Sequence, residues 1–164
     1  MELLAEQITE SQELSAYELE RNKHTPTLIH GAIQANLGFE IKLNYGQKFR
    51  IASEVLLDTM PKGSTPDLIL YPKQPLDYKN DPARRTDAPL LSVEIQSGSQ
   101  STKDMTDKLE SYFYFGITSC WIVIPNLQAI LVYDNPFHYN FFHGDEILKD
   151  TNLDIEIDLK KVFE

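Results

Sequence analysis

The stretch APLLSVEIQSGSQSTKDMTDKLESYF, residues 88–113, joins a short apolar run to a polar turn and a helical pattern. Leu90 to Ile95 is typical of a buried strand, and Lys103 to Gly116 predicts a helix that the glycine terminates. Glu94 lies near the end of the apolar run, and Gln96 follows two residues later. The strand and the helix indicate the fold class. The role of Glu94 depends on which residues lie beside it.

A second acid occupies a similar point in the pattern. Asp67 follows Pro66 and opens the short apolar strand predicted for residues 67–71. Taken alone, each acid is equally well explained as a solvated strand end. Two adjacent core strands, however, would bring both carboxylates to one place, and like charges held close together require a cation or a proton. Mg²⁺ is the expected cation, because it takes one or two carboxylates together with waters and phosphate.

The rest of the chain follows the same mixed pattern of helices and strands. Helices are expected at residues 9–21 and 28–42. Further strands are expected at 49–57, 120–125, 128–134 and 139–143, and a final strand with a brief helical tail at 153–163. Residues 72–89 are expected to form an exposed loop. This order predicts an α/β fold in which a mixed central sheet is flanked by helices. We expect residues 1–164 to form a single domain.

The composition limits the classes of function. The 164 residues include 15 basic and 25 acidic side chains, and the net charge of -10 argues against broad adhesion to nucleic acid or anionic membranes. A local basic patch remains compatible with that balance. The single Cys120 excludes an internal disulfide framework and fits a reducing compartment. No basic, apolar leader begins the chain and no apolar run nears ~20 residues, so we expect a soluble, cytoplasmic protein with no membrane partner.

Several ordered motifs together resemble one nuclease family. They are YELERNKHTPTLIHGAIQANL near the start, TPDLILYP, PLLSVEIQS, the helix positions Asp104, Lys108, Tyr112 and Gly116, and SCWIVIP. The chain resembles the Uma-type restriction endonuclease-like proteins, a bacterial domain family abundant in cyanobacteria, within the PD-(D/E)XK nuclease superfamily. The likeness covers nearly all of the chain. It implies a restriction-endonuclease-like fold whose central mixed sheet carries the site.

The resemblance also implies a set of site residues. Asp67 and Glu94 would bind the metal, and the backbone carbonyl of Ile95 would add a ligand. Glu18 matches an acid near the start of the family pattern, where it would position the attacking water or a second ion. Glu20 competes for that role, since only one of the two can point inward.

The family pattern places a lysine at position 96, where this chain has Gln96. Gln96 could orient a water or contact a phosphate, but it carries no charge. Lys108 matches a lysine that the family keeps on the following helix, and from there its amine would stabilise the charge of the transition state. The competing interpretation is a surface ion pair with Asp104, four residues earlier on the same helix.

The leading hypothesis is therefore a Mg²⁺-dependent endonuclease, with Mn²⁺ as a substitute, that hydrolyses DNA phosphodiester bonds. The alternative is a catalytically inactive module that keeps the nuclease fold for binding or assembly. A weaker third hypothesis is hydrolysis of RNA or of a small phosphorylated molecule. A homodimer is compatible with all three, because many nucleases of this superfamily pair to cut two strands.

Other polar residues have competing interpretations. His30, on the second helix, fits either packing or a site role, and Glu54 fits a solvated strand position better than a site. His138 and His143 are five residues apart, which places them on opposite faces of a strand and disfavours a zinc pair. The basic residues of the long loop favour solvation over phosphate binding; these are Lys73, Lys79, Arg84 and Arg85.

Overall fold

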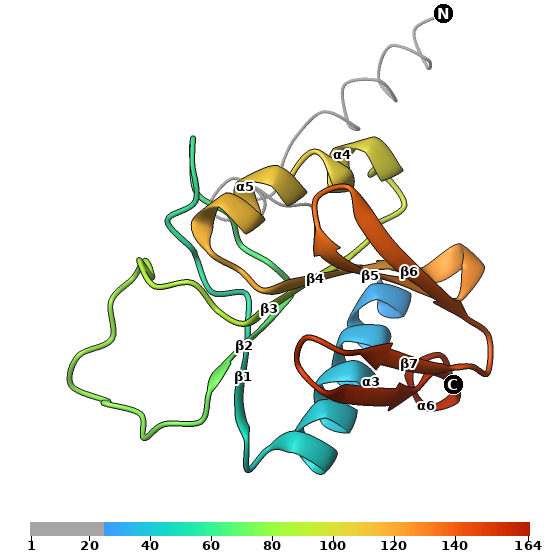
Figure 1. Cartoon of the computed structure of the whole chain (residues 1–164), viewed down its shortest axis with the longest axis horizontal. Coiled ribbons are helices and arrows are strands. Elements are labelled where there is room, and N and C mark those ends of the chain that lie inside the picture. Colours follow the sequence, from blue (N-terminus) through green and yellow to red (C-terminus); the bar gives the residue numbers. More distant parts are fainter. Residues whose placement is uncertain (1–24) are drawn as a thin grey trace, which may run out of the picture.

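The structure is a computed structural model that describes residues 25–164. Its centre is a six-stranded sheet with the strand order β1-β2-β3-β4-β5-β6 (Figure 1). The strands are β1 (Phe49–Ser53), β2 (Leu68–Pro72), β3 (Leu91–Ile95), β4 (Ser119–Ile124), β5 (Ala129–Asn135) and β6 (His138–His143). Only the β3–β4 pair is parallel, which gives the mixed sheet that the sequence predicted.

A parallel pair needs a crossover connection, and two short helices supply it. They are α4 (Thr102–Thr106) and α5 (Leu109–Phe115), which lie against one face of the sheet (Figure 1). Helix α3 (Leu28–Tyr45) covers the opposite face, together with the β7 (Ile147–Asp150) and β8 (Ile155–Asp158) hairpin and α6 (Leu159–Val162). Within the described residues, no helix has the length and apolar character needed to cross a bilayer.

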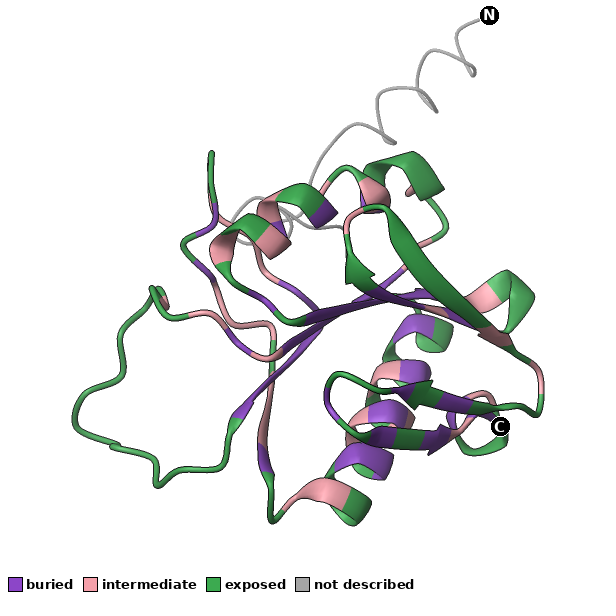
Figure 2. Cartoon of the chain, viewed as in Figure 1, coloured by how far each residue is buried: buried purple, intermediate pink, exposed green. Residues whose placement is uncertain are grey.

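Strand β3 is buried along its whole length, because both faces of the sheet are covered (Figure 2). Leu91, Val93 and Ile95 pack into the core cluster on the α3 side. Ser92 and Glu94 alternate with them and therefore face the α5 side. The apolar run of residues 90–95 thus holds one carboxylate inside the protein.

The expected helix at 103–116 is divided. Asp107 and Lys108 separate α4 from α5, and Gly116 ends α5 in the left-handed conformation with φ 114°. The expected strand at 49–57 stops at Ser53, because Glu54 has a φ of 55° and turns the chain out of the sheet. Strand β7 was not predicted, and the helix expected at 9–21 lies outside the described residues.

Candidate functional site

Asp67 and Glu94 lie next to each other across two antiparallel strands. Leu68 pairs with Val93, and the Asp67 amide donates to the Val93 carbonyl at 3.0 Å, so the next position of the ladder sets Asp67 beside Glu94. Asp67 is 1% exposed and Glu94 is 4% exposed. Neither is a solvated strand end, because a buried carboxylate is costly unless specific partners stabilise it.

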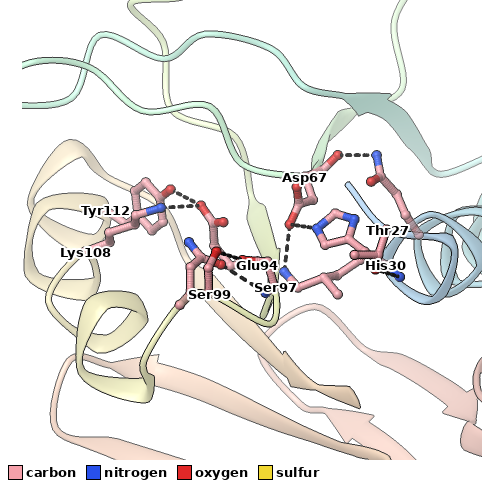
Figure 3. A network of polar contacts seen from close by, with 11 residues as sticks. Thr27, His30, Asp67, Glu94, Ser97, Ser99, Lys108 and Tyr112 are labelled. Atoms are coloured by element: carbon pink, nitrogen blue, oxygen red, sulfur yellow. Dashed lines mark hydrogen bonds and ion pairs between the residues drawn. The ribbon is translucent and has the colours of Figure 1, made fainter. Parts of the chain in front are cut away.

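The Asp67 carboxylate is held from the α3 side (Figure 3). Its Oδ2 accepts the Ile95 amide at 2.7 Å and lies 3.2 Å from His30 Nε2. Gln34, one turn further along α3, donates its side-chain amide to the Asp67 carbonyl at 3.0 Å. Two side chains of one helix therefore fix both the side chain and the backbone of Asp67.

The Glu94 carboxylate is held from the opposite side, by residues of the crossover (Figure 3). Its Oε1 accepts the phenol of buried Tyr112 and lies 3.8 Å from Lys108 Nζ. Burial, followed by the negative charge of Glu94, raises the pKa of Tyr112 well above its ordinary value. The phenol therefore remains a neutral donor through the physiological range. The lysine side chain is 35% exposed, so it joins the buried carboxylate to solvent.

The break between α4 and α5 determines where Lys108 points. Ser101 caps α4 in a capping box, in which the Asp104 carboxylate accepts the Ser101 amide at 3.0 Å. Lys103 takes Asp107 as its partner one turn later, at 2.8 Å. The surface pair between Asp104 and Lys108 is therefore not the arrangement found. Lys108 stands at the start of α5, and its amine turns inward to Glu94.

The remaining predicted residues have other environments. The Gln96 side-chain amide donates to the Gln100 carbonyl at 3.0 Å, and Gln100 Oε1 accepts the Ser97 amide at 3.1 Å. Gln96 thus closes the turn after β3, and its contact with a water or phosphate stays a prediction. The Ile95 amide is engaged by Asp67, while the metal-binding role of its carbonyl is untested. Glu18 and Glu20 lie outside the described residues.

Three residues that sequence reasoning discounted or missed contact the site. His30 contacts Asp67, and the signal for it was a histidine on the inner face of a helix. Tyr112 follows Lys108 by four residues and so shares its helical face, and this spacing is a signal that the sequence contains. Glu54 is half-buried at the end of β1, and its amide donates to the Asp67 carbonyl at 3.3 Å.

The loop arginines already have acidic partners. Arg84 lies 2.8 Å from Asp58, and Arg85 makes two contacts with Asp87, at 2.9 and 2.7 Å. A phosphate would have to compete with these carboxylates, so the loop offers less free positive charge than its composition indicates.

The donor chemistry of the site fits a hard divalent cation. Asp67 and Glu94 supply carboxylate oxygens from neighbouring positions of two paired strands, and the Ile95 carbonyl is a further oxygen on the strand of Glu94. Within residues 25–164, no group of three His, Cys, Asp or Glu side chains is arranged to hold a metal ion. Mg²⁺ accepts two carboxylates together with waters as its ligands. Zinc sites are instead typically built from histidine nitrogens and cysteine sulfurs.

Two comparisons with known proteins bear on the family and the fold of this chain. The Uma2 family model, described as "Putative restriction endonuclease", matches residues 3–157. The fold is similar to the crystal structure of a "putative nuclease belonging to DUF820" from Anabaena variabilis, with a TM-score of 0.73. That alignment has 20% sequence identity and covers 86% of this chain and 83% of the other. No curated protein sequence matches the chain.

Proposed function

The chain belongs to the Uma2 family, and on that premise we propose that it is a Mg²⁺-dependent nuclease that hydrolyses DNA phosphodiester bonds. The observation that carries the proposal is the convergence of Lys108 on Glu94, which lies beside Asp67. A positive charge next to two buried carboxylates is the composition expected of a phosphodiesterase site. The lone cysteine, Cys120, fits a cytoplasmic location.

Asp67 and Glu94 would hold the metal, with the Ile95 carbonyl as a further ligand. Bound Mg²⁺ would polarise the scissile phosphate and make a coordinated water more acidic. Lys108 would stabilise the charge that develops on the phosphate, since its amine is already 3.8 Å from Glu94. Mn²⁺ offers the same oxygen preference and should substitute.

The other side chains would orient these groups. The Ile95 amide and His30 restrict the Asp67 carboxylate to one direction, and the Tyr112 phenol does the same for Glu94. Glu18 would position the attacking water, and Gln96 would contact a phosphate from the turn after β3. Pre-orientation matters because the acids then need little rearrangement when the substrate binds.

The decisive test measures DNA cleavage and metal binding on the same preparations. We expect supercoiled plasmid to be cleaved in Mg²⁺ or Mn²⁺ and to remain intact with a chelator. Asp67→Asn keeps the shape of the side chain but removes its charge, so cleavage should fall by about 100-fold or more, and Mg²⁺ binding by calorimetry should be lost. Asp87→Asn, at an acid that pairs with Arg85 in the loop, is the matched control and should retain both. Full cleavage by Asp67→Asn would refute the proposal.

The second candidate is a nuclease-fold binding module without catalysis. Gln96 favours it, because the amide stands where the family pattern has a lysine and is engaged in a turn. A module of this kind would bind DNA without cleaving it in either metal. A parallel screen with RNA and with small phosphate esters tests the third hypothesis. Cleavage of one of these substrates, with DNA left intact, would distinguish it from both the DNA nuclease and the inactive module.

A further inference from the structure

Helix α3 is apolar on both sides. Its inner face packs Ile33, Leu37 and Ile41 into the core. The opposite side, here called the α3 outer face, consists of five exposed residues at helical spacing: Leu28, Ala32, Ala35, Phe39 and Leu43. A helix that is apolar all round is normally covered on every side.

The exposure of this face is substantial. Leu28 is 87% exposed, Phe39 is 63% exposed and Leu43 is 64% exposed. Ile29 lies at its flank and is 63% exposed. Four large apolar side chains are thus exposed along one helix, and exposed apolar patches commonly mark interaction sites.

Charge is scarce on the same face. The whole chain has 25 acidic residues, yet α3 contains one acid, Glu40, and that residue is buried on the inner side. Lys42 is the single exposed charge of α3 and lies at the edge of the outer face. The centres of protein interfaces are similarly depleted of charge, whereas a solvated helix of so acidic a chain would be expected to carry acids.

We propose that the α3 outer face binds the same face of a second copy of this chain, with the two helices antiparallel. A two-fold axis between Ala35 and Asn36 sets Leu28 opposite the second copy's Leu43. It also sets Phe39 opposite the second copy's Ala32, so the largest side chain meets a small one. The face is thus complementary to itself, as a two-fold interface requires.

The exposed apolar surface of α3 would supply more than half of what a standard dimer interface buries. Helix α3 has 18 residues and is therefore about 27 Å long. Its four large exposed side chains supply on the order of 500 Å² of apolar surface per copy, against about 800 Å² per partner in a standard interface. A groove of about 250 Å³ beside Phe39 adds to it, and Gly38, Lys42, Ile51, Ala52, Ser53 and Leu68 line this groove.

The groove extends the contact toward strand β1, which is an edge strand of the sheet. Side chains of the second copy would enter the groove beside Phe39, at one end of the pair of α3 helices. The inner face of α3 carries His30 and Gln34, which contact Asp67. A dimer through α3 would therefore hold two candidate sites in a fixed relation, but the inference does not depend on what those sites do.

The first test is the mass in solution by light scattering. The wild-type protein should show twice the chain mass of 18.8 kDa at micromolar concentration. Phe39→Glu places one acid from each copy in the interface, so the measured mass should halve while the circular dichroism spectrum stays that of the folded chain. Tyr78→Glu is the control, because Tyr78 is 87% exposed and lies in the loop after β2, and it should stay dimeric.

The second test is a crosslink across the proposed axis. Ala35→Cys would set two new thiols next to each other, and mild oxidation should link two chains. The native thiol does not interfere, because Cys120 is buried and burial raises its pKa to about 12. Leu127→Cys, at a residue 60% exposed and far along the chain, should remain unlinked.

Two outcomes would overturn the inference. One is a wild-type protein that stays monomeric at every concentration tested. The other is an Ala35→Cys variant that crosslinks no faster than Leu127→Cys. If residues 1–24 of the same chain covered the face instead, a Leu14→Cys/Ala35→Cys double variant would form its disulfide within a single monomeric chain.

Discussion

Two clusters of polar side chains beside the same sheet contain buried acids. One is built around Asp150 and the other around Asp67 and Glu94, and the partners of these acids differ in kind. Asp150 is 2% exposed and accepts hydrogen bonds from four neutral donors. These are Ser119 Oγ at 3.2 Å, Trp121 Nε1 at 2.8 Å, and the amides of Asn152 at 3.0 Å and Leu153 at 3.2 Å. Asp67 and Glu94 instead contact the side chains of His30, Lys108 and Tyr112.

The difference separates a carboxylate whose donors are all neutral from the two carboxylates of the candidate site. Asp150 joins the turn after β7 to strand β4, and its donors direct both of its oxygens into the protein. Charge-assisted hydrogen bonds of this sort are among the stronger ones in proteins. At the other cluster, the partly exposed Lys108 connects the Glu94 carboxylate to solvent. Burial alone therefore does not distinguish the two sets of acids, whereas the chemistry of their partners does.

The largest expected effect comes from disrupting the cluster around Asp150. Asp150→Asn removes the charge and turns an amide group toward donors that need an acceptor. We expect the free energy of unfolding to fall by about 3 kcal/mol, because buried donors that lose their partner carry their full desolvation cost. Urea denaturation measures this loss. Mg²⁺ binding and cleavage per folded molecule should be unchanged, and a loss of either would erase the distinction between the clusters.

The next effect is confined to the candidate site. Lys108→Met keeps the length of the side chain but removes its charge, and we expect DNA cleavage to fall about 100-fold, or about 2.7 kcal/mol of transition-state stabilisation. Mg²⁺ binding should persist, since the carboxylates are untouched. Lys103→Met is the matched control, because Lys103 pairs with Asp107 on the same crossover. Equal cleavage by the two variants would remove Lys108 from the proposed mechanism.

The smallest expected effect is the pH dependence of stability that arises from Cys120, whose thiol senses the charges of both clusters. Burial is the main cause that raises the pKa of this thiol to about 12, and the charges of Glu94 and Asp150 add to it. The folded thiol thus keeps its proton when the unfolded thiol would lose it. The corresponding stability is complete below the unfolded pKa near 9 and is lost as pH rises toward 12.

At one pH unit above the unfolded thiol pKa, the loss from Cys120 should be about 1.4 kcal/mol. Denaturation at pH 8 and pH 10 measures it, and Cys120→Ala should remove that part of the pH dependence. Glu94→Gln and Asp150→Asn should each lower the pKa of the Cys120 thiol, as followed by its ultraviolet absorbance. An unchanged thiol pKa in both variants would mean that neither charge reaches it.

Much of the fold could be predicted because local patterns repeat within each element. The alternation around Glu94 and the acid that opens the DLILY strand predicted two neighbouring strands, and the register sets Asp67 beside Glu94. The partners of Lys108 could not be predicted in this way. Asp104 at four residues' distance was an equally good candidate, and the helix break at Asp107 and Lys108 decided between them.

Other parts of the site had weaker signals. Strand β7 is four residues long with only Leu148 and Asp150 buried, so its alternation was too short to detect. Asp150 therefore passed unnoticed, although it is among the best satisfied acids of the described residues. His30 could be assigned to the inner face of a helix, but nothing local indicates that this face meets the strand that Asp67 opens.

By itself, the sequence determined the order of helices and strands, the mixed sheet and the two acids at strand ends. These depend on periodicity and turn chemistry within a few residues. Only the tertiary structure decided which charges meet. Asp67 and Ile95 are 28 residues apart, Glu94 and Tyr112 are 18 apart, and their contacts depend on strand register and on the rotation of each helix about its axis. Those quantities arise when the elements pack together, because burial selects one arrangement from many that local patterns allow equally.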